Sequence, residues 1–168
     1  MDYEIIEQEI NDAAAALIGV LREKNMTFAT AESCTAGMIS ARMGDFAGVS
    51  DVLLGGVVSY ANEVKMNVLG VPENVLATVG AVSEECAKHM AEGARRATGA
   101  GVTVSVTGIA GPGGGTAKKP VGTVCFGVST ADGTHTETAH FPPDADRGMI
   151  RRMTVRHALK LVAETIKG

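Results

Sequence analysis

Helix-like and strand-like segments alternate along this chain, and this alternation restricts its fold more than any other feature of the sequence. Apolar residues recur with helical spacing over residues 3–24, and a short β-prone run follows at 27–31. The pattern continues, with helices predicted over 37–46, 62–70, 84–98 and 144–167 and strands over 51–60, 102–109, 123–130 and 134–141. Such alternation predicts an α/β fold of three layers, α/β/α, with a mixed, mostly parallel five-stranded sheet.

Glycines refine this prediction in two places. The pair Asp132 and Gly133 lies between the last two strands and predicts a β-hairpin. Gly55 and Gly56 lie inside the predicted strand 51–60, where they indicate a bulge or a close approach of another segment.

The composition limits the class of protein. A length of 168 residues predicts a single domain over 1–168, and 45% apolar and 20% charged residues are typical of soluble globular proteins. No run approaches the roughly 18 apolar residues of a membrane span, and the N-terminus does not resemble a signal peptide, so we expect a cytoplasmic protein without a membrane partner. The net charge of −4 argues against nucleic acid. Small and Met residues on the helix faces favour a homo-oligomer, a dimer or larger.

The segment TAESCTAG, residues 30–37, places two candidate nucleophiles where a strand gives way to a helix. Free N–H groups at such a turn favour anions, so Ser33 could attack a carbonyl with an oxyanion site beside it. Ser33 or Thr35 could instead cap the helix, and Thr35 is the better candidate for a cap. Cys34 is the other possible nucleophile, although buried cysteines are usually inert and no histidine is placed as its base.

The segment SYANEVK, residues 59–65, offers a candidate base. Tyr60 ends a strand at the edge where ligands of α/β proteins gather, and Lys65 lies one turn into the next helix. A lysine accepts a proton near pH 7 only if its pKa falls from about 10.4 to about 7–8. Tyr60 would relay the proton or hydrogen-bond the amine. A solvated lysine is the simpler interpretation of the spacing alone, and Asn62 is predicted to cap the helix.

A glycine-rich segment, TGIAGPGGGTAKKPVGT at 107–123, matches neither the P-loop nor the dinucleotide pattern. Its backbone can still approach a ligand and offer N–H groups to a phosphate or a carboxamide, the alternative being a flexible surface loop. Lys119 is well placed to meet an anion. Arg147 and Arg151 share one face near a helix N-terminus, where a bound anion, solvent or a subunit contact would account for two cations.

Six segments occur in order across residues 31–159: AESCTAG, SYANEVK, LGV, GAVSEE, TGIAGPGGGTAKKPVGTV and DRGMIRRMTVRHAL. Together they resemble the C-terminal domain of the CinA family, in particular its stand-alone nicotinamide-nucleotide amidohydrolases. The resemblance implies an α/β/α fold and hydrolysis of the carboxamide of nicotinamide mononucleotide (NMN). The products would be ammonia and nicotinic acid mononucleotide, in pyridine nucleotide salvage, and neither a cofactor nor a metal is implied.

The resemblance also implies roles for particular residues. Ser33 would be the nucleophile, Lys65 the general base and Tyr60 an assisting residue. N–H groups of residues 34–37 would stabilise the oxyanion, while the glycine-rich loop and Arg147 would hold the ribose and the phosphate. The expected substrate contacts are Cys34, Thr35, Gly37, Thr107, Gly108, Ala110, Gly111, Gly113, Lys119 and Arg147.

The chain departs from the family pattern at three positions. The family usually reads ESCTGG, whereas Ala36 replaces the first glycine here, which matters if that backbone needs a positive φ. Gly113 and Lys118 stand where acidic residues are common, so we expect a shift in substrate preference. We also expect the activities of the larger N-terminal domain of two-domain CinA proteins to be absent.

Two other classes of function remain open. A non-catalytic nucleotide-binding or regulatory module would use the same loops and keep Lys65 charged, because only an enzyme needs the lowered pKa. An accessory role in DNA uptake or repair, suggested by the family's historical name, fits the acidic charge balance poorly.

Overall fold

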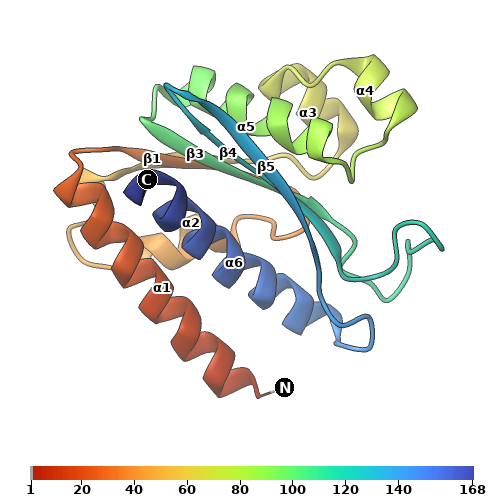
Figure 1. Ribbon diagram of the computed structural model, residues 1–168, viewed down its shortest axis with the longest axis horizontal. Coiled ribbons are helices and arrows are strands. Elements are labelled where there is room, and N and C mark those ends of the chain that lie inside the picture. Colours follow the sequence, from red (N-terminus) through yellow and green to blue (C-terminus); the bar gives the residue numbers. More distant parts are fainter. Residues whose placement is uncertain (1) are drawn as a thin grey trace.

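Helices cover both faces of a five-stranded sheet in the computed structural model, which describes residues 2–168 (Figure 1). The strands are β1 (Phe28–Glu32), β2 (Leu53–Val58), β3 (Val102–Gly108), β4 (Thr123–Thr130) and β5 (Gly133–His140). The helices are α1 (Tyr3–Glu23), α2 (Met38–Gly44), α3 (Asn62–Leu69), α4 (Glu73–Thr78), α5 (Glu84–Thr98) and α6 (Arg147–Lys167), with a 3₁₀ turn η1 (Val49–Asp51). The predicted three-layer α/β/α architecture is confirmed.

The strand order is β2-β1-β3-β4-β5. β1 pairs in parallel with β2 and β3, whereas the β3–β4 and β4–β5 pairs are antiparallel. Four strands therefore run in one direction and β4 alone is reversed, so the mixed sheet is mostly parallel in strand direction. The predicted hairpin is present, with Thr130 opposite Gly133. The C-terminal ends of β1, β2 and β3 consequently meet at one edge of the sheet.

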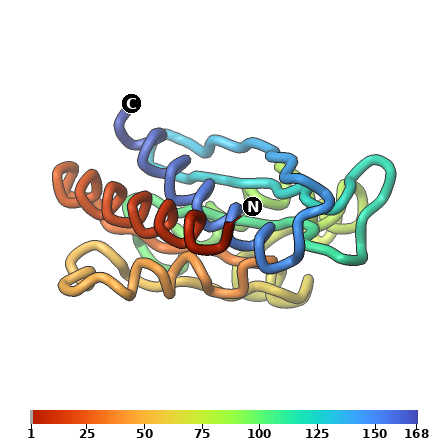
Figure 2. Tube along the Cα trace, turned by 90° about the horizontal axis from the view of Figure 1, so that it is seen from below, coloured from red at the N-terminus to blue at the C-terminus, as the bar shows by residue number. Residues whose placement is uncertain are grey.

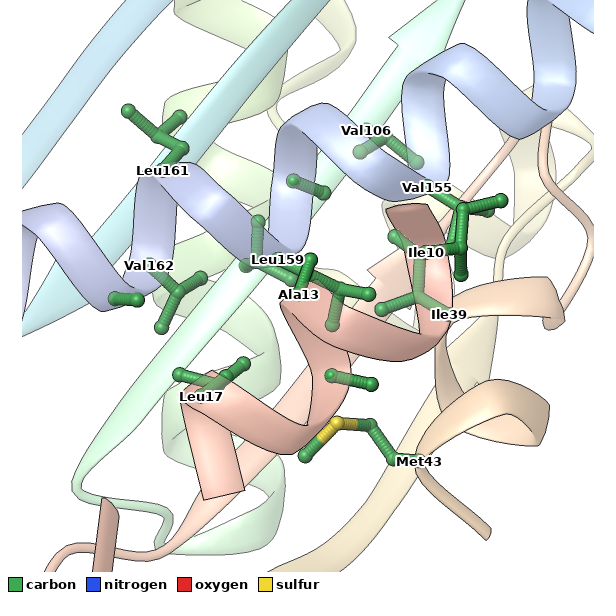
Figure 3. Close-up of a cluster of buried hydrophobic side chains, with 14 of the residues drawn as sticks. Ile10, Ala13, Leu17, Ile39, Met43, Val106, Val155, Leu159, Leu161 and Val162 are labelled. Carbon is green, nitrogen blue, oxygen red and sulfur yellow. The ribbon is translucent and has the colours of Figure 1, made fainter. Parts of the chain in front are cut away.

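One face of the sheet carries the larger apolar core. α1 and α6 lie side by side and run in the same direction, and α2 packs against both of them (Figures 1 and 2). Figure 3 shows side chains of all three helices meeting in this layer, among them Ile10, Leu17, Ile39, Met43 and Leu159. The strands contribute Val and Phe side chains to the same cluster. Burial of this apolar surface is the main stabilisation of the layer.

The opposite face, covered by α3, α4 and α5, is built from smaller and more polar side chains. Three buried hydroxyls of β3, those of Thr103, Ser105 and Thr107, donate to main-chain carbonyls of Ala91, Ala87 and Ala81. A Cβ on Gly127 of β4 would lie only 2.6 Å from the Ala87 oxygen. α5 therefore approaches the sheet closely enough to hydrogen-bond its strands.

Both expectations for the glycines of β2 are met. The register moves from Leu53 opposite Phe28 to Gly55 opposite Ala29, so one residue of β2 is bulged out. A Cβ on Gly56 would lie 2.3 Å from hydroxyl oxygens of two neighbouring side chains, so this glycine permits a close approach.

Helix ends gave mixed results. Ser83 caps α5 as the Ser-Glu-Glu pattern indicates, by accepting the N–H of Cys86. The prediction that Asn62 caps α3 is wrong, because Ala61 occupies that position and no side chain supplies a cap. The short helix α4 was not predicted, since six residues behind Pro72 carry too little periodicity to separate a helix from a connecting loop.

Candidate active site

Ser33 and Lys65 meet at the C-terminal edge of the sheet. Ser33 directly follows β1, and its N–H donates to the carbonyl of Val106 in β3 over 3.0 Å. Lys65 lies in the first turn of α3, and its Nζ is 3.1 Å from Ser33 Oγ. The two residues are 32 positions apart in the chain, so the topology of the sheet brings them together.

The Lys65 amine is buried without a carboxylate partner. The residue is only 1% exposed, and Nζ lies 2.9 Å from the carbonyl of Ser59 and 3.1 Å from that of Tyr60. No ion pair within residues 2–168 includes Lys65. Burial lowers the pKa of this amine, and the nearby thiols of Cys86 and Cys34 offset only part of that shift.

A neutral amine fits these three contacts. It has two N–H donors, which the carbonyls of Ser59 and Tyr60 accept, and one lone pair, which remains for the Ser33 hydroxyl. In that state the hydroxyl donates to Nζ and is polarised for loss of its proton. The geometry would therefore let a neutral Lys65 amine accept the proton of Ser33.

The Tyr60 side chain has a different contact from the one predicted. It is 56% exposed, and its hydroxyl accepts a hydrogen bond of 2.8 Å from Arg147. The same guanidinium donates to the carbonyl of Gly111 in the glycine-rich loop over 2.8 Å. Arg147 thus links the segment after β2 to the loop after β3. Tyr60 contacts Lys65 only through its main-chain carbonyl in residues 2–168, and not through its hydroxyl.

Glu32, the last residue of β1, was not predicted as part of the site. Its carboxylate is completely buried and accepts five hydrogen bonds. Two come from the hydroxyls of Thr30 and Thr35, and three from the N–H groups of Gly37, Ile39 and Ser40. Glu32 therefore neutralises the first turn of α2, and only its position directly before Ser33 could have signalled this from the sequence.

Few N–H groups of the 34–37 loop remain for an oxyanion. The N–H of Ala36 donates to the Ser33 carbonyl, and that of Gly37 donates to Glu32. Within residues 2–168, the N–H groups of Cys34 and Thr35 have no hydrogen-bond acceptor. The four donors expected from the sequence thus reduce to two.

The side chains of Cys34 and Thr35 face the protein. Cys34 is 5% exposed within the apolar core, and burial raises its pKa to about 12. It is therefore a protonated thiol at neutral pH and a poor nucleophile. The Thr35 hydroxyl donates to Glu32, so the prediction that Thr35 caps α2 is wrong. Gly37 holds the N-cap position, with φ of 95°.

Ala36 adopts the positive φ that its place in the family pattern raised as a possibility. Its φ is 51°, in the left-handed region where residues with a Cβ are disfavoured. The glycine usual in the family would remove that strain.

Several of the remaining residues predicted to contact the substrate instead make contacts within the protein. The Lys119 amine donates to the carbonyls of Val79 and Val82, so it ties the glycine-rich loop to the segment before α5. The Thr107 hydroxyl is likewise engaged with Ala81. Gly108 packs tightly against β4, Ala110 is buried, and Gly113 is exposed with open space around it.

Two general searches complete the description of the site. Within residues 2–168, no three His, Cys, Asp or Glu side chains gather in a way that could hold a metal ion. None of the helices in this range combines the length and apolar character needed to cross a bilayer.

Comparison with known proteins shows which proteins this chain resembles. The family model described as the CinA C-terminal domain matches residues 10–166. A CinA-like protein of Mycolicibacterium gilvum is 48% identical over 160 residues, and one of Thermotoga maritima is 43% identical over 166 residues. These alignments cover 95% and 99% of this chain but only 36% and 39% of the two relatives, which are much longer proteins.

Solved structures agree with the fold over nearly their whole length. The competence/damage inducible protein CihA of Agrobacterium tumefaciens superimposes with a TM-score of 0.90 at 38% identity, covering 95% of this chain and 96% of the other. The competence damage-inducible protein A of Klebsiella pneumoniae gives 0.89 at 33% identity, covering 94% and 97%.

Proposed function

This chain belongs to the family of the CinA C-terminal domain, and we propose that it is an amidohydrolase that converts NMN to nicotinic acid mononucleotide and ammonia. The observation that carries this proposal is the buried Lys65 amine, 3.1 Å from Ser33 Oγ. An amine in that position is of use to an enzyme because burial lowers its pKa toward the range of a general base.

The reaction would proceed in two halves. Neutral Lys65 takes the proton of Ser33, and Oγ attacks the carboxamide carbon to give a tetrahedral oxyanion. The N–H groups of Cys34 and Thr35 are the loop donors free to stabilise that oxyanion. The Lys65 ammonium then gives its proton to the leaving nitrogen, the C–N bond breaks, and ammonia departs from an acyl-enzyme.

Water completes the cycle. Lys65 takes a proton from water, the resulting hydroxide attacks the acyl carbon, and collapse of the second tetrahedral species releases the nicotinate carboxylate. Ser33 recovers its proton from Lys65. One water is consumed, and the proton of the new carboxyl group is taken up by the released ammonia to give ammonium, so atoms and charge balance.

Arg147 would bind the far end of the substrate. Its guanidinium lies between the Tyr60 hydroxyl and the Gly111 carbonyl, both at the rim of the site, and a phosphate oxygen could replace either contact. Binding energy from a phosphate held there would position the amide over Ser33. Free nicotinamide, which has no phosphate, should therefore be a poorer substrate than NMN.

A non-catalytic nucleotide-binding module is the alternative. It would use Arg147 and the glycine-rich loop in the same way but would have no need for a base beside Ser33. The contacts of Lys65 with two carbonyls and one hydroxyl favour the enzyme, because a lysine kept only for its charge would face a carboxylate or solvent.

Ammonia release from NMN by the purified protein tests the proposal, beside the Ser33→Ala variant and an exposed control, Ser50→Ala. We expect release by the wild type and the control, and none above background from Ser33→Ala. If the wild type releases no ammonia while NMN raises its Tm, the binding module is correct and the amidohydrolase proposal is wrong.

A further inference from the structure

Arg151 lies one helical turn after Arg147, yet its guanidinium turns to the nucleophile loop. Its Nε donates to the carbonyl of Cys34 and its Nη2 to that of Thr35, each over 3.0 Å. The residue is half-buried, and the two contacts use neighbouring N–H donors on one edge of the planar guanidinium. Arg151 thus needs no bound anion, solvent or subunit contact, the three alternatives that the sequence left open, to explain its position.

The contact with Cys34 has a consequence for the next N–H. The carbonyl of Cys34 and the N–H of Thr35 belong to one planar trans peptide, in which they point in opposite directions. Arg151 holds the carbonyl on its own side, so the Thr35 N–H is directed away from the guanidinium. This N–H is one of the two in the loop without an acceptor in residues 2–168.

Glu32 holds the same loop from the other side. It accepts the Thr35 hydroxyl at 2.6 Å and the N–H groups of Gly37, Ile39 and Ser40. The first turn of α2 is therefore already saturated by a carboxylate and has no donor left for a second anion. An oxyanion formed at Ser33 has only the Cys34 and Thr35 N–H groups of this loop to meet.

We propose that Arg151 is a positioning residue that fixes the Cys34–Thr35 peptide so that its N–H faces the oxyanion formed at Ser33. Rotation of this peptide would turn the Cys34 carbonyl toward the developing negative charge, where two oxygens repel each other. Arg151 itself bonds only to main-chain oxygens of the loop in residues 2–168 and acts through them. This proposal rests on the proposed amidohydrolase activity, and it names Arg151 as the residue that orients one N–H donor of the oxyanion site.

The test compares Arg151→Gln and Arg151→Lys with Arg152→Gln. Arg152 is a matched control because it lies on the same helix, is also half-buried and makes two guanidinium contacts, to Glu7 and to the Gly148 carbonyl, away from the nucleophile loop. For NMN hydrolysis we expect kcat of Arg151→Gln to fall about 10- to 100-fold with KM changed less than about twofold. Arg151→Lys should lie between this variant and the wild type, because one ammonium cannot hold both carbonyls in the same geometry.

A second assay does not depend on NMN. With p-nitrophenyl acetate, Ser33 Oγ bonds to the acetyl carbon, p-nitrophenolate leaves, and Lys65 takes the serine proton. The rate of this acetylation, followed by p-nitrophenolate absorbance and by the acetyl mass on Ser33, should fall in Arg151→Gln by a similar factor. Arg152→Gln should keep the wild-type rate.

The outcomes separate this proposal from the proposed function. Unchanged kcat and acetylation in a folded Arg151→Gln overturn the positioning role, and so does a loss confined to KM. If the wild type releases no ammonia from NMN but is acetylated at Ser33 in an Arg151-dependent way, the substrate is wrong and the positioning role stands. If Arg151→Gln does not fold, Arg151→Lys decides: wild-type kcat in that variant contradicts the proposal.

Discussion

Two ionisable side chains, Glu32 and Lys65, are buried close to Ser33, one at each side of the sheet, and their surroundings differ in kind. Glu32 has five hydrogen-bond donors around its carboxylate, three of them from the first turn of α2. Lys65, on α3 across the sheet, has two carbonyls and one hydroxyl around its amine and no carboxylate. Equal burial therefore leaves one charge fully compensated and the other dependent on neutral dipoles.

The difference would allow Glu32 to serve stability and Lys65 to serve the proposed chemistry. A buried carboxylate with a full set of hydrogen-bond donors is held in one place. A buried amine with only dipoles for partners is penalised when charged, so its pKa falls and it becomes able to accept a proton. Four variants or conditions test this comparison, taken from the largest expected effect to the smallest.

Lys65→Met should abolish the proposed activity. The substitution keeps an unbranched side chain of similar length and removes the base, so we expect kcat/KM for NMN to fall by about 10³-fold or more. The measurement is the initial rate of ammonia release over a range of NMN concentrations, with exposed Lys160→Met as the control. Activity within tenfold of the wild type would show that Lys65 is not the base.

Glu32→Gln should act chiefly on stability. An amide replaces one accepting oxygen by an NH₂ group, which would face N–H and O–H donors in a completely buried position. We expect a loss of about 3 kcal/mol in the free energy of unfolding, measured by urea denaturation. Exposed Glu63→Gln is the control. If Glu32→Gln is as stable as Glu63→Gln, the buried carboxylate of Glu32 does not stabilise the fold.

The pH dependence of stability should distinguish Lys65 from solvated lysines. Its pKa is lowered in the folded protein, so between that value and about 10.4 the unfolded chain binds a proton that the folded protein does not. Stability from this group therefore increases with pH across the window and is lost as pH falls. Over this range, the Tm of the wild type should rise more steeply with pH than the Tm of Lys65→Met, which lacks the amine. Parallel curves would contradict the lowered pKa.

Ala36→Gly should give the smallest effect and a stabilising one. Ala36 has φ of 51°, and a left-handed conformation costs a residue with a Cβ about 1 kcal/mol. Relief of that strain should raise Tm by about 2 °C after the extra chain entropy of glycine is counted. Ala41→Gly, in the body of α2, should instead lower Tm. A lower Tm for Ala36→Gly would mean that this loop needs the alanine side chain.

Much of the fold followed from local patterns. The alternation of helices and strands predicts the three layers, and Asp132–Gly133 predicts the hairpin, because periodicity and turn propensity act over a few residues. The family motifs also put Ser33, Tyr60 and Lys65 at strand ends and a helix start, where parallel strands gather their loops. Their catalytic roles stay predictions until the variants above are measured.

The partners of the side chains did not follow from the sequence. Glu32 ends a β-prone run, where a charge usually means a solvated edge, and nothing local indicates that α2 begins against its carboxylate. Arg151 and Lys119 looked like anion-binding cations, yet both hold main-chain carbonyls of distant segments. These contacts join residues 37 to 117 positions apart.

The sequence by itself therefore determined the elements other than the short helices α4 and η1, their order and the candidate chemistry, because these depend on residue types and short spacings. The tertiary structure alone decided which charges are compensated and which N–H groups stay free, because hydrogen bonds over long sequence separations depend on how the packed layers meet. The distance from Lys65 to Ser33 and the saturation of Glu32 both arise in this way. α2 packs against β1 on one face of the sheet, and α3 packs against α5 on the other face.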